Sequence, residues 1–203
     1  MIEPGLWDMV MRLRSRGISD ARVIEAFELA PRSRFVTEPQ REAAYDELRL
    51  PLPCGQEMLP PLLAAQMLQV ADVRRGQKLL LVGLGSGQLA GLSARMGARV
   101  FAVERYAGLV AHAERNLARA GIDSVTSRWG DGRLGWPSQA PFDRILLSAS
   151  AIKPPKALLN QLAPDGRLVG IVDGQLSSMG QGDATVFFPA TTTPLEPGKS
   201  ASL

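Results

Sequence analysis

The most constraining feature of the chain is a glycine-rich turn between a short apolar run and a helical pattern. The run "KLLLVG" (78–83) has the length of a buried strand, and "VGLGSGQ" (82–88) continues directly from it. Glycines let the backbone turn sharply and approach a ligand closely, while the first turn of a helix offers unpaired N–H groups. The segment therefore predicts a strand–loop–helix unit of an α/β fold, with a ligand site at the loop.

Strand-like and helical segments alternate through the rest of the chain. Beyond the glycine loop, apolar runs at 99–104, 142–150 and 166–172 are separated by helical patterns, one ending at Ala120 and one starting at Pro155. Strands that alternate with helices are typical of parallel sheets. The fold class predicted is a Rossmann-like α/β fold with a doubly wound, mostly parallel sheet.

The length of the chain suits one domain with a small extension, because single α/β domains commonly reach about 200 residues. Residues 1–60 hold two helical patterns and a proline-rich loop, and are expected to form a helical cap and the substrate-side loop. Residues 61–190 are expected to form the Rossmann-like core, ending in an edge hairpin within "DATVFFPATTT" (183–193). Residues 191–203, polar and interrupted by prolines, are expected to be a flexible tail.

Charge and the scarcity of two residue types argue against several functions. The chain has 23 basic and 20 acidic residues and no Lys/Arg run longer than Arg74–Arg75, so no nucleic-acid partner is expected. The single Cys54 excludes an internal disulfide, and with the single His112 it argues against a metal centre. No secretory signal and no apolar stretch of ~18 residues is found. A soluble, cytoplasmic protein without a membrane partner is expected.

An acidic residue one strand beyond the loop points to a nucleoside-bearing cofactor. Glu104 lies 104 − 87 = 17 residues past the last loop glycine, where a carboxylate can accept both hydroxyls of a ribose. A dinucleotide loop would carry a third glycine at Gln88, so the tighter G-x-G-x-G favours S-adenosylmethionine. "GDG" (130–132) supports this interpretation, since Asp131 can accept from an adenine amino group. A nicotinamide-dependent enzyme is the less favoured alternative.

These motifs, with others in the same order, resemble the protein-L-isoaspartate O-methyltransferase family. The resemblance runs through "RGISDARVIEAFELAPRSRFV", "AAYDELRLPLPCGQ", "LLLVGLGSGQLAGLSA", "VFAVER", "GDGRLGWPSQAPFDRILLSAS" and "LLNQLAPDGRLVGIV". It implies a Rossmann-like enzyme that moves a methyl group from S-adenosylmethionine to the α-carboxylate of an isoaspartyl residue. Its partner would be a protein or peptide carrying that residue, and the methylation would start the repair of aged proteins.

The resemblance also implies which residues bind the cofactor and which face the substrate. The cofactor would contact the glycine loop, the end of the next strand at the ribose, and the GDG turn at the adenine. This predicted set is Gly83, Leu84, Gly85, Ser86, Gly87, Glu104, Arg105, Asp131 and Gly132. The predicted substrate-side set is Gln56, Glu57, Leu59 and Ser148, and no catalytic residue is assigned because the family's serine position is Leu59.

The chain departs from the family pattern at the substrate turn. The family reads Gly-Gln-Thr-Ile-Ser, whereas this chain has Glu57 and Leu59 at the two hydroxyl positions. An ionised substrate carboxylate needs no general base, but it needs positioning and donors that hold it in line. Leu59 offers no donor. An inward-facing Glu57 would repel the substrate by about 1 kcal/mol in water and about 4 kcal/mol at an effective dielectric of ~20.

Two further departures lie beside the cofactor loop. Leu81 stands where the family has an acid, which removes a partner for the cofactor's ammonium group, although an apolar residue also suits a buried strand. Gln88 stands where the family usually has an aromatic residue. The departures leave open a methyltransferase that acts on a changed substrate, with another carboxyl or another nucleophile in place of the isoaspartyl residue. They also leave open a catalytically impaired or inactive descendant that acts as a cofactor-binding or regulatory/interaction module.

Overall fold

A seven-stranded sheet forms the centre of the fold in the computed structural model, which describes residue 3 and residues 5–201. The strand order is β5-β4-β3-β6-β7-β8-β9, parallel from β5 to β7 and antiparallel at the β8 and β9 edge. These strands are β3 (Lys78–Val82), β4 (Arg99–Glu104), β5 (Val125–Trp129), β6 (Phe142–Ala151), β7 (Leu162–Val172), β8 (Gln175–Met179) and β9 (Ala184–Pro189). The predicted doubly wound, mostly parallel sheet is confirmed. The edge hairpin expected within 183–193 starts earlier in the chain, because its first strand is β8 and only its second strand, β9, lies in that segment.

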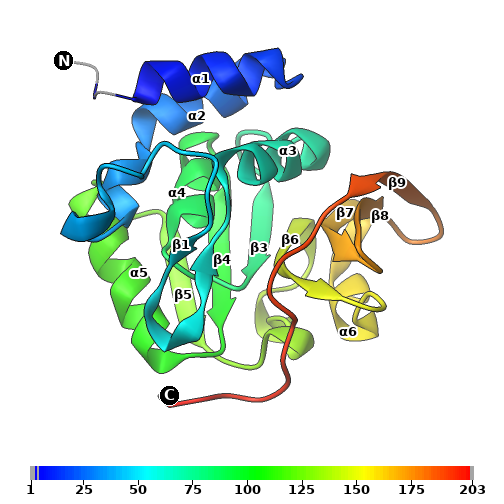
Figure 1. The fold of residues 1–203 in the computed structure, drawn as a ribbon. Coiled ribbons are helices and arrows are strands. Elements are labelled where there is room, and N and C mark those ends of the chain that lie inside the picture. Colours follow the sequence, from blue (N-terminus) through cyan, green and yellow to red (C-terminus); the bar gives the residue numbers. More distant parts are fainter. Residues whose placement is uncertain (1–2, 4, 202–203) are drawn as a thin grey trace.

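Helices cover both faces of the sheet and one end of it (Figure 1). They are α1 (Leu6–Ser15), α2 (Ala21–Leu29), α3 (Pro61–Ala71), α4 (Gln88–Arg95), α5 (Ala107–Arg119) and α6 (Lys156–Leu159). A separate two-stranded hairpin pairs β1 (Leu50–Pro51) with β2 (Glu57–Met58). Within the described residues, no helix is long and apolar enough to cross a membrane.

The apolar pattern of each helix follows from what it contacts. In α5, the buried residues Leu109, Ala113 and Leu117 recur every four positions, so one face packs on the sheet and the other meets solvent. Helix α3 is apolar on most sides because it lies between the sheet and the cap formed by α1 and α2. Strand β3 is fully buried from Leu79 to Val82, as expected for a central parallel strand covered on both faces.

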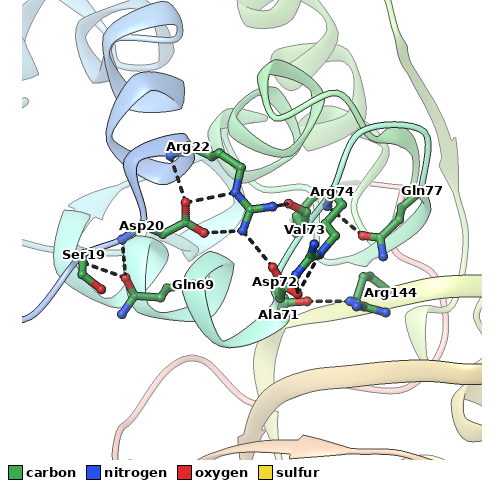
Figure 2. A network of polar contacts seen from close by, with 10 residues as sticks. All are labelled: Ser19, Asp20, Arg22, Gln69, Ala71, Asp72, Val73, Arg74, Gln77 and Arg144. Atoms are coloured by element: carbon green, nitrogen blue, oxygen red, sulfur yellow. Dashed lines mark hydrogen bonds and ion pairs between the residues drawn. The ribbon is translucent and has the colours of Figure 1, made fainter.

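A polar network fastens the cap to the core (Figure 2). Arg22 Nη2 lies 2.6 Å from Asp20 Oδ2 at the start of α2 and 2.8 Å from Asp72 Oδ1 just after α3. Arg144 Nε of β6 donates to the Ala71 carbonyl at 2.5 Å. Exposed ion pairs contribute about 0.2–1 kcal/mol each, so the network orients the cap more than it stabilises the chain. The network lies at the amino end of β3, at the opposite end from the glycine loop.

The order of the parallel strands places a crevice at a defined position. The chain passes from β3 to β4 and β5 on one side, and then returns to β6 on the other side of β3. Ligands of such sheets bind at the carboxyl ends of the strands where the order reverses. In this molecule that position lies between the ends of β3 and β6, next to the glycine loop.

Candidate cofactor and substrate site

A cavity of about 350 Å³ lies at this reversal point. The glycine loop after β3 and the end of β4 form its floor, and the β1–β2 hairpin forms the opposite side. Its volume is at the lower end of the range for small-molecule sites, which are about 300–1,000 Å³. The cavity is therefore large enough for a small ligand held between the loop and the hairpin.

Most of the residues predicted from the sequence meet in the wall of this cavity. Those in the wall are Gln56, Glu57, Leu59, Gly83, Leu84, Gly85, Ser86, Glu104, Arg105, Gly132 and Ser148. As far as the described residues define it, the wall excludes Gly87 and Asp131. Gly87 is the N-cap of α4, with φ 88°, and a Cβ placed on it would lie 3.2 Å from Ala113 Cβ.

The glycine loop leaves no room for a side chain at its first glycine. Gly83 has φ 89°, and a Cβ placed on it would lie 2.2 Å from Ser148 Oγ. That hydroxyl donates to the carbonyls of Gly83 at 2.8 Å and Val82 at 3.0 Å, which ties the end of β6 to the loop. Only glycine fits at position 83, and the backbone there remains open to the cavity.

Glu104 is buried at the end of β4 and holds the loop through backbone hydrogen bonds. Its Oε2 atom accepts from the N–H groups of Leu84 at 2.9 Å and Gly85 at 3.1 Å. Its Oε1 atom accepts from the Tyr106 N–H at 3.0 Å. These three hydrogen bonds offset the free-energy cost of burying the carboxylate. Oε1 keeps a lone pair that can accept from a further donor, such as a ribose hydroxyl. Glu104 therefore couples the shape of the loop to any ligand in the cavity.

Asp131 is engaged by the chain itself. Oδ1 accepts from the Arg133 N–H at 2.9 Å, and Oδ2 accepts from the Gly198 N–H at 2.8 Å. An adenine amino group would therefore need a second lone pair of this carboxylate or a movement of the segment that carries Gly198. The adenine contact of Asp131 stays a prediction.

Residues 191–200, here termed the C-terminal strap, run across the carboxyl ends of the strands (Figure 1, red). The strap makes parallel bridges from Pro194 to Ser150 at the end of β6 and from Ser200 to Tyr106 after β4. Four of its residues, Thr193 to Glu196, line the cavity. The sequence did not indicate this role, because the strap has neither helical nor strand periodicity and its partners are distant in the chain. The flexibility expected of residues 191–203 stays a prediction.

The glutamine beside the loop has a physical explanation in a buried arginine. Arg32, fully buried beneath the cap, donates from Nη1 to Gln88 Oε1 at 2.9 Å. Burial lowers the pKa of Arg32 to about 10, so the group remains a cation at neutral pH. A phenylalanine or tryptophan at position 88 could not accept this hydrogen bond. The pair could not be predicted from a local pattern, since its members are 56 positions apart.

Leu81 is part of the hydrophobic core. Its side chain is fully buried in the middle of β3 and does not belong to the described cavity wall. The position therefore serves packing, as the apolar run around it indicated. A charged side chain at position 81 would find no charged or polar side chain among its immediate neighbours in β3, which are apolar.

The substrate-side turn presents no hydroxyl to the cavity, and its two variant residues, Glu57 and Leu59, have different surroundings. Glu57, with 45% of its side chain exposed, has its Oε2 atom 3.7 Å from Arg49 Nη1. Arg49 also donates to the carbonyl and hydroxyl of Thr191 in the strap. Leu59 is half-buried, packs against the core and lines the cavity. The Glu57 charge is thus partly neutralised at the mouth of the cavity.

Comparison with family models decides the family. Residues 7–183 match the model described as protein-L-isoaspartate(D-aspartate) O-methyltransferase (PCMT). The chain belongs to this family. A curated family member from Paramagnetospirillum magneticum, named protein-L-isoaspartate O-methyltransferase, is 38% identical and covers 97% of this chain and 96% of its own length. A protein of the same name from Maricaulis maris is 42% identical over 84% of this chain and 80% of its own length.

Solved structures of the family share the fold. A protein-L-isoaspartate O-methyltransferase has a TM-score of 0.81 at 22% identity, and the match covers 93% of this chain and 65% of that longer chain. A putative family member from Plasmodium falciparum, solved with S-adenosyl-L-homocysteine, has the same TM-score and identity over 93% of this chain and 97% of its own. The Rossmann-like methyltransferase fold predicted for this PCMT family member is confirmed.

Proposed function

We propose that this protein transfers a methyl group from S-adenosylmethionine to the carboxylate of an isoaspartyl residue in a protein or peptide. One observation carries the proposal: a member of the PCMT family has a cavity at the reversal point of its sheet, with the glycine loop on one side and the substrate hairpin on the other. The loop and Glu104 lie where a nucleoside cofactor would bind such a sheet.

The residues of the cavity fit this cofactor. Bound S-adenosylmethionine would supply a methyl group on a positively charged sulfur; a carboxylate oxygen forms the new bond to carbon as the sulfur–carbon bond breaks, and S-adenosylhomocysteine and a methyl ester result. The open backbone at Gly83 and Gly85 would lie against the methionine part, and Glu104 Oε1 would accept from a ribose hydroxyl. Leu52, Leu89 and Leu109 give the cavity apolar walls that exclude water.

The substrate would enter between the β1–β2 hairpin and the C-terminal strap. No proton has to move in the transfer, because the substrate carboxylate is already ionised at neutral pH. The chain therefore has to hold the carboxylate in line with the methyl group rather than supply a base. The pairing of Glu57 with Arg49 reduces the repulsion that an isolated Glu57 would impose on such a substrate.

The two alternatives are less well supported. Curated relatives that match 97% and 84% of the chain carry the methyltransferase name, and this does not favour an inactive descendant. A nicotinamide cofactor is disfavoured by membership of the PCMT family. We further propose that the protein works in the cytoplasm on protein substrates, without a nucleic-acid, membrane or metal partner.

Calorimetry with two ligands and one matched variant tests the proposal. The wild-type chain should bind S-adenosylhomocysteine and should not bind NAD. Gly83→Ala, whose new Cβ would meet Ser148 Oγ, should lose at least tenfold in S-adenosylhomocysteine affinity. Gly76→Ala is the control, because Gly76 also has a positive φ but has nothing within 4 Å of a new Cβ. Binding of NAD in preference to S-adenosylhomocysteine would contradict the proposal.

Mass spectrometry tests the transfer itself. A peptide with one isoaspartyl residue, incubated with the protein and S-adenosylmethionine, should gain one methyl group on that residue's carboxylate. Methylation of another group in the peptide, or of none, would contradict the proposed substrate.

A further inference from the structure

The cavity has two sides at its substrate end, and only one was expected from the sequence. One side is the hairpin turn with Glu57 and Leu59. The other is the C-terminal strap, from which Thr193 and Pro194 line the cavity. Thr193 has a hydroxyl and lines the cavity from the strap, whereas the hairpin has no hydroxyl at the two positions where the family pattern has them.

Hydrogen bonds to β6 fix the backbone around Thr193. The Ser150 N–H donates to the Thr193 carbonyl at 2.8 Å, and the Leu195 N–H donates to the Ser150 carbonyl at 2.8 Å. The Thr192 hydroxyl donates to the Ser148 carbonyl at 3.0 Å. Thr193 is therefore held beside Ser148, on the substrate side of the cavity, by contacts that do not use its own side chain.

The hydroxyl of Thr193 is available to donate to a ligand at the substrate end, where the Ser148 proton is already used. Ser86 only accepts a hydrogen bond, but it belongs to the glycine loop on the cofactor side. Ser148 Oγ donates to the carbonyls of Val82 and Gly83, and buried Ser86 Oγ accepts from the Gln88 N–H at 3.2 Å. Among residues 3 and 5–201, the Thr193 hydroxyl has no hydrogen-bond partner. The other hydroxyl in the wall belongs to Tyr106, next to Glu104 and thus on the ribose side.

The charged groups near the substrate end do not replace this donor. Glu57 is an acceptor when ionised, and Arg49 is engaged with Glu57 and with Thr191. Leu59 has no polar atom in its side chain. A substrate carboxylate entering between hairpin and strap would meet two side-chain donors. One is the Thr193 hydroxyl, and the other is the second N–H of Gln56 Nε2, whose first N–H donates to the Cys54 carbonyl at 3.3 Å.

We propose that Thr193 donates a hydrogen bond to the carboxylate of the isoaspartyl substrate and so takes over the positioning done by hydroxyls at positions 57 and 59 in the family pattern. This inference rests on the proposed function. A neutral hydroxyl holds the carboxylate without giving it a proton, so the oxygen keeps the electron pair that forms the new bond to the methyl carbon. Because the bond is made before and during transfer, its loss should raise KM more than it lowers kcat.

The test removes the hydroxyl and preserves the shape of the side chain. In Thr193→Val, the Kd of an isoaspartyl peptide for the protein saturated with S-adenosylhomocysteine, measured by calorimetry, should rise roughly 10- to 100-fold, the range for a hydrogen bond to a charged group. The KM for the peptide should rise in parallel, and the Kd of S-adenosylhomocysteine should not change. Thr193→Ser should restore peptide binding to within about threefold of the wild type.

Thr185→Val on the exposed face of β9 is the matched control and should behave as the wild type in every measurement. Unchanged peptide binding in Thr193→Val overturns the inference and leaves the proposed function intact. Loss of S-adenosylhomocysteine affinity in Thr193→Val, without rescue by Thr193→Ser, would assign the residue to packing and also overturn it. A wild-type protein that neither binds nor methylates the isoaspartyl peptide overturns the proposed function, and this inference with it.

Discussion

The Asp131 Oδ2 atom accepts a hydrogen bond from the Gly198 N–H at 2.8 Å, which joins the end of β5 to the C-terminal strap. Neighbouring contacts reinforce this connection: Arg105 Nη1 donates to the Pro197 carbonyl at 2.6 Å, and Lys199 Nζ lies 4.8 Å from the centre of the Trp129 ring. The strap is thereby fastened beyond the cavity as well as at β6. Its residues Thr193 to Glu196, which line the cavity, lie between these two attachments.

Weakening the fastening at Gly198 should open that wall. Gly198 has φ 77° and nothing lies within 4 Å of a new Cβ, so Gly198→Ala costs only backbone energy, about 1 kcal/mol for a left-handed position. We expect S-adenosylhomocysteine to dissociate up to about fivefold faster, measured by stopped-flow fluorescence with Trp129 as the reporter. Gly76→Ala carries the same backbone strain away from the strap. If both variants release the ligand at the same rate, the strap is not a wall of the occupied site.

Removing the Glu104 carboxylate should damage both the loop and the cofactor site. Glu104→Ala leaves the N–H groups of Leu84, Gly85 and Tyr106 without their acceptor, so we expect a loss of about 2–3 kcal/mol in the free energy of unfolding. S-adenosylhomocysteine affinity should fall by about 1.5–3 kcal/mol. Urea unfolding and calorimetry measure the two effects. The control is Glu114→Ala on α5, an exposed acid whose side chain, among the described residues, accepts only from the Ser127 hydroxyl.

The opposite result for Glu104 would be informative. A Glu104→Ala protein that is folded and binds S-adenosylhomocysteine as tightly as the wild type would remove this carboxylate from the cofactor site. Glu104 would then have only the structural role of shaping the loop.

The hydroxyls of the family pattern should compensate for a missing Thr193 hydroxyl. In the Thr193→Val background, the double change Glu57→Thr and Leu59→Ser places donors on the facing side of the cavity. We expect at least a tenfold recovery of kcat/KM for the isoaspartyl peptide, or about 1.4 kcal/mol. Because Leu59 packs against the core, the same change should lower the free energy of unfolding by about 1–2 kcal/mol. A folded triple variant with no recovery would show that the two sides do not share one carboxylate.

The pH dependence of stability should contain a contribution from His112. Burial lowers the pKa of His112 from its ordinary 6.5, and the nearby Arg115 and Arg119 lower it further. Between the lowered pKa and 6.5 the unfolded chain binds a proton that the folded chain does not, so stability is full above pH 6.5 and falls as the pH drops through that window. Urea unfolding at pH 7.5 and pH 5.5 should show a smaller loss for His112→Gln than for the wild type. An equal loss would remove His112 as a cause.

The core of the fold and most of the cavity wall could be predicted because their signals are local. The run from Lys78 to Val82 is apolar at every position after the first, and the glycines that follow allow few other structures. Glu104 could be found because a parallel strand carries its last residue to the same edge as the loop. Family resemblance added the substrate turn at Glu57 and Leu59, which no periodicity would have revealed.

The features that could not be predicted from the sequence depend on contacts between segments that are distant in the chain. The strap was expected to be a tail because Pro194 and Pro197 break both periodicities, yet backbone pairing to Ser150 and the bond to Asp131 need no periodic pattern. The Arg32–Gln88 hydrogen bond could not be predicted for the same reason, since the sequence does not distinguish a buried arginine from an exposed one. The side chain of Glu57 is directed toward Arg49, which lies just before β1 and belongs to no recognisable motif.

The most direct test of the account is the rate of methyl transfer from radiolabelled S-adenosylmethionine to two peptides that differ only in one residue, isoaspartyl in the first and ordinary aspartyl in the second. With cofactor saturating, the full chain should label the isoaspartyl peptide at least a hundredfold faster, and the label should be released by mild base as expected for a methyl ester. Equal labelling of both peptides, or no labelling by a folded protein that binds S-adenosylhomocysteine, would contradict it.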